Sequence, residues 1–160
     1  ATLSTWLDEH PEDLKAQYRL ALSHLELERH DAARSAFARV LELQPDNVVA
    51  LNNQALLLRD KEPQQAHAYA ERAYELNPDP RIMDTLGVIL LQRGETERAL
   101  SLLEQASMKR PDLATIQYHY AMALASSGRK DEARKVLKRI ADADYPEREE
   151  ADALLAELGG

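Results

Sequence analysis

Apolar residues return along the chain at the spacing of one helical face. From residue 83 the sequence reads MDTLGVILLQRGETERALSLLEQASMKRP, in which Met83, Leu86 and Leu90 lie three and four residues apart, and Ala99 and Leu103 lie four apart. Polar side chains fill most positions between them, so the pattern predicts two successive amphipathic helices. The whole chain is rich in Ala, Leu, Glu, Arg and Gln, and aromatic residues make up 5%. This composition favours helix over strand, and we expect an all-α protein.

The helical pattern repeats with a nearly constant period. Prolines recur at intervals of 34, 33, 33 and 35 residues, at Pro11, Pro45, Pro78, Pro111 and Pro146. Each of the last four follows a pair of small residues at similar distances: Ala21 and Ala33, Ala55 and Ala66, Gly87 and Ala99, Ala121 and Ala133. A large side chain where two helices cross closely would overpack the contact. The small pairs therefore predict that the two helices of each period cross at short distance, and this explains a glycine inside a helical segment.

Turn residues divide each period into two helices. Gly94 and Gly128 stand where a helix is expected to end in a left-handed residue, and Pro63 suits the first position of a new helix. The recurring proline then ends each unit, because it cannot continue a helix and disfavours helical geometry in the residue before it. Each period is thus predicted to be a helix–turn–helix hairpin.

The spacings resemble those of the tetratricopeptide repeat (TPR) family, whose 34-residue pattern combines Trp, Leu-Gly, Tyr, Ala, Phe, Ala and Pro. The third repeat matches best, and Phe37 keeps the family's aromatic residue in the first. The matching residues of the third repeat are Leu86, Gly87, Leu90, Gly94, Ala99, Leu103, Ala106 and Pro111. The resemblance implies a right-handed α-solenoid of antiparallel helix hairpins. It covers a single domain, 1–160, divided into a half repeat 1–11, repeats 12–45, 46–78, 79–111 and 112–146, and a capping helix 147–158.

Some positions depart from the family pattern. The place of the family's Trp is taken by Gln17, Leu51, Met83 and Gln117, and His24 replaces its tyrosine. These changes predict a looser core in the first and last helix pairs, and they leave the fold prediction intact.

The resemblance also implies a binding surface. In TPR proteins the first helix of each pair lines a concave groove that holds an extended peptide or a partner helix. Asn53 is the strongest candidate, because a short amide can clamp a peptide main chain through one donor and one acceptor. Every exposed helix face carries polar residues, so the cluster matters more than any one member. The predicted groove residues are Lys15, Tyr18, Arg19, Leu22, Asn52, Asn53, Leu56, Arg81, Asp84, Thr85, Val88, Tyr118, His119 and Met122.

A more specific TPR site, the carboxylate clamp, is not expected. Family members with this clamp use two lysines, two asparagines and an arginine, of which Asn53 and approximately Arg81 are present here. The other clamp positions hold Tyr18, Leu22 and Thr85. The basic residues of the predicted groove still outnumber its one acidic residue, Asp84, and this favours a peptide with some acidic character.

The net charge of the chain and its distribution narrow the classes of partner. The formal net charge is −8, which argues against nucleic acid because phosphate binding needs clustered Lys and Arg. Seven acidic residues and one basic residue follow from Asp142 onward, a balance of −6, so residues 1–141 carry −2. We interpret the acidic end as a capping helix, with an acidic docking motif as the alternative. Its inward residues should be Ala151, Leu154, Leu155 and Leu158, and its solvated ones Glu147, Glu150 and Glu157.

The half repeat at the start predicts a second contact surface. Leu3, Trp6 and Leu7 would expose apolar area that could pair with another copy or with a missing upstream repeat. Since no Met opens the chain, we expect an excerpt from a longer protein. The aliphatic run Val88 to Leu91 is too short to cross a bilayer, so no membrane insertion is expected. Without cysteine there are no disulfides, which fits the cytoplasm and the bacterial periplasm equally well.

No pattern for catalysis, metal binding or cofactor binding is found. The histidines show no HExxH spacing, and there is no GxSxG elbow, phosphate loop or dinucleotide fingerprint. We therefore expect a non-catalytic scaffold, without metal or cofactor, that binds a protein or peptide. Two alternatives stay open: a self-assembly module that forms homo-oligomers, and an accessory domain of a larger enzyme. The five histidines are His10, His24, His30, His67 and His119.

A second resemblance concerns the last part of the chain. The tracts YHYAMALASSGRKDEARKVLKRI (118–140) and YPEREEADALLAEL (145–158) are similar to the ends of long bacterial TPR proteins of the cell envelope. Some of those proteins are associated with exopolysaccharide export and exosortase sorting. This resemblance implies a bacterial envelope protein.

Overall fold

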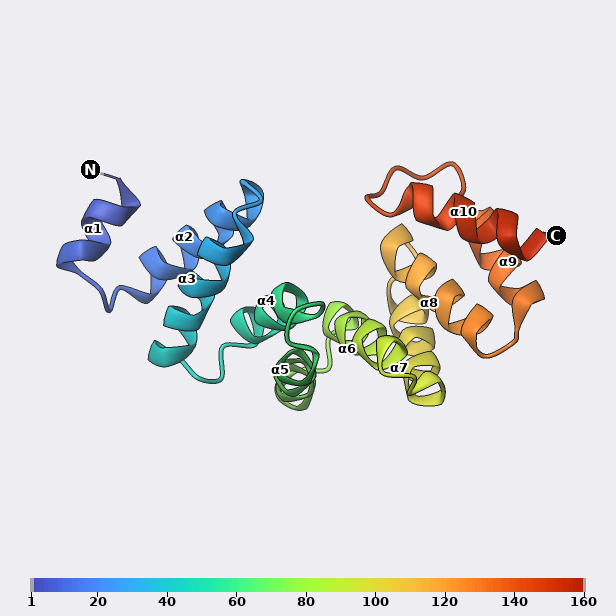
Figure 1. Ribbon diagram of the computed structural model, residues 1–160, viewed down its shortest axis with the longest axis horizontal. Coiled ribbons are helices and arrows are strands. Elements are labelled where there is room, and N and C mark those ends of the chain that lie inside the picture. The colour runs from blue at the N-terminus through green and yellow to red at the C-terminus, as the bar shows by residue number, and fades with distance from the viewer. Residues whose placement is uncertain (1, 160) are drawn as a thin grey trace. The chain divides into compact units, whose positions relative to one another are not determined.

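The computed structural model describes residues 2–159, and in this range it contains ten helices and no strand (Figure 1). The prediction of an all-α protein is therefore confirmed. The helices are α1 (Leu3–Glu9), α2 (Leu14–Glu26), α3 (His30–Leu43), α4 (Val48–Leu58), α5 (Pro63–Leu76), α6 (Pro80–Gln92), α7 (Thr96–Lys109), α8 (Ala114–Ser126), α9 (Lys130–Ile140) and α10 (Arg148–Gly159).

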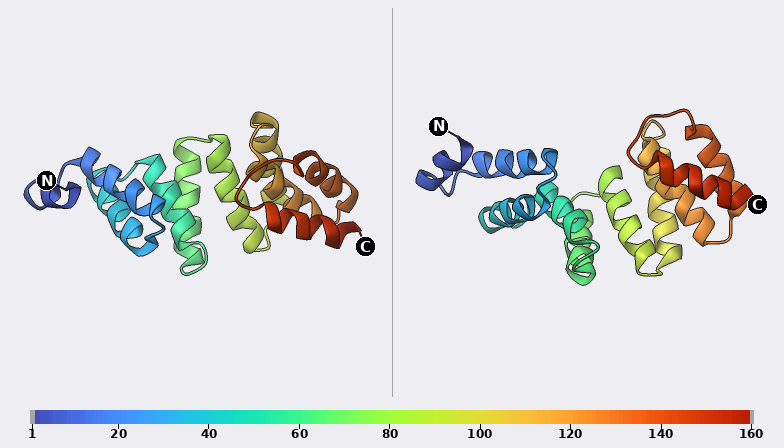
Figure 2. Two further views of the ribbon diagram at one scale, coloured as in Figure 1. Left: turned by 90° about the horizontal axis from the view of Figure 1, so that it is seen from above. Right: turned by 45° about the horizontal axis from the view of Figure 1, so that its top comes forward.

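The helices form two compact units, and each consists of paired neighbours. The N-terminal unit ends at Asn77 and contains α1 and the hairpins α2–α3 and α4–α5. The C-terminal unit begins at Pro78 and contains the hairpins α6–α7 and α8–α9, with α10 packed on α9 (Figure 2). Each predicted repeat holds one hairpin. Whether residues 1–160 act as one domain stays a prediction.

The first helix of three hairpins begins with a side-chain cap. The side chains of Asp13, Asn47 and Asp79 accept hydrogen bonds from backbone N–H groups of the following turn, at 3.0, 2.9 and 2.9 Å. Each cap satisfies a donor that the helix itself leaves free. Since every cap follows a recurring proline by one or two residues, proline and cap together fix where each hairpin starts.

The turns inside the hairpins follow the sequence with one exception. Gly94 and Gly128 have φ values of +78° and +83°, and α5 begins at Pro63, as predicted. The turn between α2 and α3 uses Glu28 at φ +54° instead of a glycine. Sequence inspection missed this residue because a side chain in the left-handed region is uncommon.

Gly87 lies on the side of α6 that faces Leu103 of α7. A Cβ atom at this position would stand 2.5 Å from Cγ and 2.9 Å from Cδ2 of Leu103, so the Leu103 side chain would have to move to make room for it. The packing explanation is confirmed, although the group that needs the space is Leu103, one turn beyond the expected partner Ala99. The alanines of the recurring pairs are all fully buried: Ala21, Ala33, Ala55, Ala66, Ala99, Ala121 and Ala133.

Two glutamines that replace the family's tryptophan donate hydrogen bonds to backbone carbonyls that precede their own helices. Gln17 Nε2 donates to the carbonyl of Pro11 at 3.0 Å, and Gln117 Nε2 donates to Ser107 at 3.0 Å. These bonds tie the start of α2 and of α8 to the preceding segment. The first and last hairpins therefore combine hydrogen bonds with apolar packing where the family pattern uses an aromatic ring.

The last helix covers the end of the C-terminal unit. Ala151 is buried, and the leucines of α10 pack against the core formed by α8 and α9, as expected. Glu147 differs from the prediction because it is not simply solvated: Thr115 Oγ1 donates to its Oε2 at 2.8 Å. This residue precedes α10, which begins at Arg148, and it ties the start of that helix to α8.

Candidate functional site

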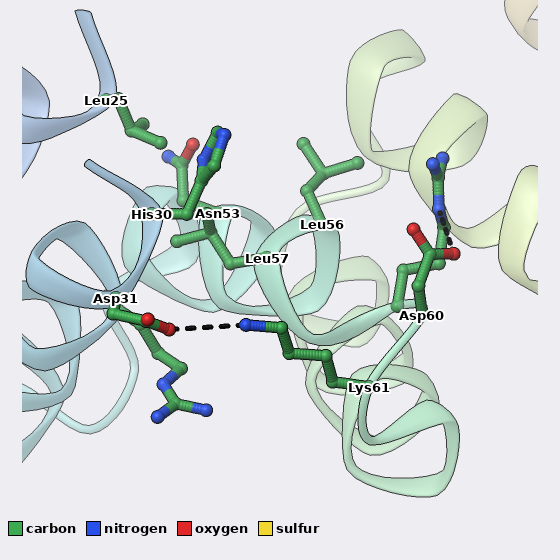
Figure 3. A pocket seen from close by; sticks show the side chains of 10 residues that line it. Leu25, His30, Asp31, Asn53, Leu56, Leu57, Asp60 and Lys61 are labelled. Atoms are coloured by element: carbon green, nitrogen blue, oxygen red, sulfur yellow. Dashed lines mark hydrogen bonds and ion pairs between the residues drawn. The ribbon is translucent and has the colours of Figure 1, made fainter. Parts of the chain in front are cut away.

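A cavity of about 610 Å³ lies beside α4 in the N-terminal unit. Leu25, Leu56 and Leu57 supply its apolar side chains, and Asn53 lies among them (Figure 3). We call it the α4 cavity. Its volume is within the range of pockets that bind ligands in proteins. Its full lining is Leu25, His30, Asp31, Arg34, Asn53, Leu56, Leu57, Arg59, Asp60 and Lys61.

One face of α4 presents the polar and apolar groups of this cavity. Val49, Asn53 and Leu56 follow at intervals of four and three residues and so share a face, and Leu56 is 44% exposed. Asn53 Nδ2 donates to the carbonyl of Val49 at 2.8 Å. One of the two N–H donors of the predicted clamp is therefore engaged within its own helix, and the other N–H and the Oδ1 acceptor remain for a ligand.

Charged side chains surround the apolar part of the α4 cavity. Lys61 Nζ lies 3.4 Å from Asp31 Oδ1, and Figure 3 shows the two facing each other along one edge. Arg34 pairs at the same distance with Glu62. Exposed ion pairs of this kind contribute about 0–1 kcal/mol, so they can reorganise around a ligand at little cost. Below them, the buried Gln54 Nε2 donates to the Arg34 carbonyl at 2.9 Å and fixes α4 against α3.

A second cavity, of about 370 Å³, lies where α1 meets α2. We call it the Trp6 cavity. Two predicted groove residues, Lys15 and Arg19, line it. Its remaining lining residues are Thr2, Leu3, Trp6, Asp13 and Ala16.

Two other predicted groove residues of the N-terminal unit have different surroundings. Tyr18 is partly buried and makes an edge contact with Phe37, with ring centroids 6.4 Å apart. Asn52 Oδ1 is buried and has no hydrogen-bond partner among residues 2–159. An acceptor left in this state costs about 1–3 kcal/mol unless water or a ligand reaches it.

In the C-terminal unit the predicted groove residues Asp84 and His119 bind each other. His119 Nδ1 lies 2.8 Å from Oδ1 and 3.0 Å from Oδ2 of Asp84, and both side chains are largely buried. Burial raises the pKa of Asp84, and the hydrogen bond from His119 opposes that rise. The pair links α6 to α8, so its polar groups are already satisfied inside the protein.

Most other groove candidates of the C-terminal unit are inside the structure. Thr85, Val88 and Tyr118 are buried, and Thr85 Oγ1 donates to the carbonyl of Arg81 at 3.1 Å. Met122 is partly buried against the core around α8 and α9. The Arg81 side chain remains exposed.

Sequence reasoning thus found some lining residues and missed others. Asn53 and Leu56 do meet in one cavity, as helical spacing suggested. Leu25, three residues after the candidate Leu22, could have been found by extending the same spacing. Asp31 and Lys61 come from the start of α3 and from a turn, where periodicity says nothing about side-chain direction.

Two further properties concern residues 2–159. In that range no three His, Cys, Asp or Glu side chains gather closely enough to hold a metal ion. None of the helices described there has the length and hydrophobicity needed to span a bilayer.

Comparison with known proteins identifies related sequences. One family model described as tetratricopeptide repeat matches residues 1–48, 18–80 and 55–106, and a second with the same description matches residues 90–158. The TPR repeat-containing protein PA4667 of Pseudomonas aeruginosa is 33% identical over 111 residues. That match covers 66% of this chain and 18% of the relative, so the chain spans less than a fifth of the relative's length.

Solved structures with the same arrangement of helices include three with low sequence identity. YrrB, described as a TPR protein with an unusual peptide-binding site, superposes with a TM-score of 0.74 at 19% identity, covering 99% of this chain and 82% of YrrB. PilF of Pseudomonas aeruginosa gives 0.74 at 18% identity, with coverages of 98% and 78%. MamA gives 0.73 at 20% identity, with coverages of 94% and 81%. These likenesses confirm the predicted fold class of helix hairpins, as found in solenoid proteins.

Proposed function

Because the chain belongs to the tetratricopeptide repeat family, we propose that it is a non-catalytic scaffold that holds an extended peptide or a partner helix in the α4 cavity. The observation that carries this proposal is a cavity of about 610 Å³ in which leucine side chains and an amide, mostly from α4, are surrounded by charged residues of α3 and of the turn after α4. Peptide sites commonly combine backbone hydrogen bonds with pockets for a few side chains.

Binding would proceed through the residues of α4. An aliphatic side chain of the partner would enter between Leu25, Leu56 and Leu57, and burying it contributes about 1.5–3 kcal/mol. Asn53 Oδ1 would accept a hydrogen bond from the partner's main chain. The second N–H of its Nδ2 would donate to a partner carbonyl while the first keeps its bond to the Val49 carbonyl, so the partner adds hydrogen bonds without breaking one inside α4.

The similar proteins support a scaffold in general terms. The description of YrrB states that it has a peptide-binding site, and its 19% identity to this chain transfers the fold alone. TPR proteins generally act as non-catalytic scaffolds, in agreement with the prediction that the chain is not an enzyme. Which partner binds, and with which sequence, would be determined by the residues that line the α4 cavity.

A display experiment tests the proposal. A random 12-residue peptide library is selected for binding to the wild-type chain and, in parallel, for binding to the Leu56→Glu and Asn53→Ala variants. The matched control is Leu27→Glu, because Leu27 is an exposed leucine of the same unit that does not line the cavity. We expect the wild type and Leu27→Glu to enrich the same peptides, and Leu56→Glu to lose them. Enriched peptides that bind Leu56→Glu as well as the wild type would refute the role of this cavity.

Self-assembly through the half repeat is a second candidate. It is favoured by the 46% exposure of Trp6, although Leu7, which was expected to share this exposed surface, is buried inside the N-terminal unit. Sedimentation at increasing concentration tests it, since a dimer that Trp6→Glu abolishes would support self-assembly. A monomer at high micromolar concentration would exclude it.

Two broader proposals concern the protein's context. The relative's much greater length fits the idea that the chain is an accessory domain within a larger protein, and the activity of the complete gene product tests it. From the resemblance of residues 118–158 to envelope TPR proteins, we propose a location in the bacterial cell envelope. Fractionation of the source cell, with detection of the protein in the envelope fraction, tests that location.

A further inference from the structure

The only tryptophan of the chain is held in a fixed orientation while much of its ring stays exposed. Trp6 Nε1 donates to Asp13 Oδ2 at 3.0 Å. His10 lies against the indole, with ring centroids 4.1 Å apart and planes inclined by 36°. The side chain nevertheless remains 46% exposed. An aromatic ring that is already fixed loses little conformational entropy when a partner covers it.

The carboxylate beside this tryptophan is fully engaged. Asp13 Oδ2 accepts the indole hydrogen bond, and Oδ1 accepts the backbone N–H of Ala16 at 3.0 Å as the cap of α2. The Ala16 hydrogen bond, followed by the Trp6 bond, lowers the pKa of Asp13, so it stays ionised. Both oxygens of Asp13 therefore already accept hydrogen bonds within the N-terminal unit.

Two cations line the same cavity without an anionic partner. Lys15 and Arg19 are one helical turn apart on α2, and within residues 2–159 neither forms an ion pair. The acidic residues of α1 and the following turn, Asp8, Glu9 and Glu12, are not among the lining residues. The positive charge is thus confined to the α2 side of the cavity. An added carboxylate would gain charge-assisted hydrogen bonds there and relieve the repulsion of two neighbouring cations.

We propose that the Trp6 cavity docks an acidic segment of a protein partner. A carboxylate of the segment binds between Lys15 and Arg19, and a neighbouring aliphatic side chain packs on the exposed part of the Trp6 ring. Tryptophan and arginine are the residues that most often dominate binding energy at interfaces. This site shares no lining residue with the α4 cavity, so it adds a second contact and does not depend on the proposed peptide site.

The tryptophan itself supplies the readout. Because Trp6 is the only tryptophan, its fluorescence reports on this cavity alone. The probe is the blocked peptide acetyl-Gly-Glu-Glu-Leu-Glu-Glu-Gly-amide, and the controls carry Gln or Lys in place of Glu. We expect the acidic probe to shift the emission with an affinity at least about fivefold above that of the Gln probe, and the Lys probe to give no shift. Raising the NaCl concentration from about 0.05 M to about 0.5 M should weaken the binding of the acidic probe.

Variants separate charge recognition from folding. Lys15→Gln and Arg19→Gln should each lower the affinity for the acidic probe about fivefold. The affinity of Arg19→Lys should stay within about twofold of the wild-type value, because lysine keeps the charge. The matched control is Lys130→Gln, an exposed lysine of the C-terminal unit, which should leave binding unchanged. Circular dichroism checks that every variant keeps its helix content.

Four outcomes would overturn the proposal. Equal affinity for the Glu and Gln probes, or no emission change up to about 5 mM probe, would exclude an acidic ligand. Wild-type affinity in a Lys15→Gln/Arg19→Gln double variant would exclude the two cations. An emission shift that follows protein concentration without any probe would identify the occupant as a second copy of the chain. The display experiment on the α4 cavity is unaffected by any of these results.

Discussion

Leu56 and Val88 hold the same place in successive repeats, yet their surroundings differ. Each follows the small residue of its first helix, Ala55 in α4 and Gly87 in α6. Leu56 is 44% exposed and lines the α4 cavity, whereas Val88 is 6% exposed. The repeat pattern therefore determines which residues share a helix face, and the neighbouring elements determine whether that face is open to a ligand.

The closed face of α6 has an identifiable cause. This helix packs against both α7 and α8, and the Asp84–His119 pair fastens it to α8. Eight residues of α6 are buried compared with five of α4. Within the N-terminal unit, α4 has an amide and a leucine at the corresponding positions and keeps them accessible.

Introducing a charge at the two equivalent positions should give the largest difference. Val88→Glu places a carboxylate in a buried site and should destabilise the C-terminal unit by at least about 3 kcal/mol. Leu56→Glu should cost less than about 0.5 kcal/mol, because the side chain can turn into water. Urea unfolding followed by circular dichroism measures both. Similar losses for the two variants would show that the faces are equally open or equally closed.

Substitution of Gly87 in α6 should have the next largest effect on stability. Gly87→Leu should destabilise the C-terminal unit by about 2–3 kcal/mol, because the new side chain overlaps Leu103. Combining it with Leu103→Ala should cost less than the sum of the two single changes. The measurement is hydrogen exchange of the amides of α6 and α7. Strict additivity would show that Leu103 is not the obstacle.

Breaking the buried pair should have a smaller effect. Asp84→Asn or His119→Gln should each lower the stability of the C-terminal unit by about 1–2 kcal/mol, since each leaves a buried polar group with a poorer partner. A double-mutant cycle measured by thermal unfolding gives the coupling of the two side chains. A coupling near zero would mean that the pair does not fasten α6 to α8.

The smallest expected effect is a pair of opposite pH dependences in the C-terminal unit. Burial raises the pKa of Asp84 above 3.8, so its contribution to stability is greatest below 3.8 and is lost as pH rises through the raised value. The hydrogen bond from Arg110 lowers the pKa of Asp112 to about 2, so that contribution is present above 3.8 and is lost as pH falls toward about 2.

Thermal midpoints between about pH 2 and about pH 7 test both signs. Asp84→Asn should steepen the loss of stability in acid, because it removes the group that favours low pH. Asp112→Asn should make that loss more gradual. The opposite result for either variant would refute its assignment.

The sequence predicted the helices well because their causes are local. Proline and small residues at fixed intervals mark each hairpin, and the left-handed Glu28 was not foreseen among its turn residues. The open or closed state of a face could not be read in this way, because it depends on which helix packs over it. Asn53 and Thr85 have the same position in their repeats, yet only Asn53 lines a cavity. The ion pair of Asp31 and Lys61 joins a helix start to a distant turn, and no spacing rule predicts such a contact.

The most direct test of the central claim is a titration of isotope-labelled protein with a peptide selected by display, followed by amide NMR spectra. The account predicts that the signals of Leu56, Leu57 and the Asn53 side-chain amide shift together in the N-terminal unit. It also predicts that the signals of Asp84, Thr85 and Val88 stay in place. Shifts confined to residues 78–159, with the signals around α4 unchanged, would contradict it.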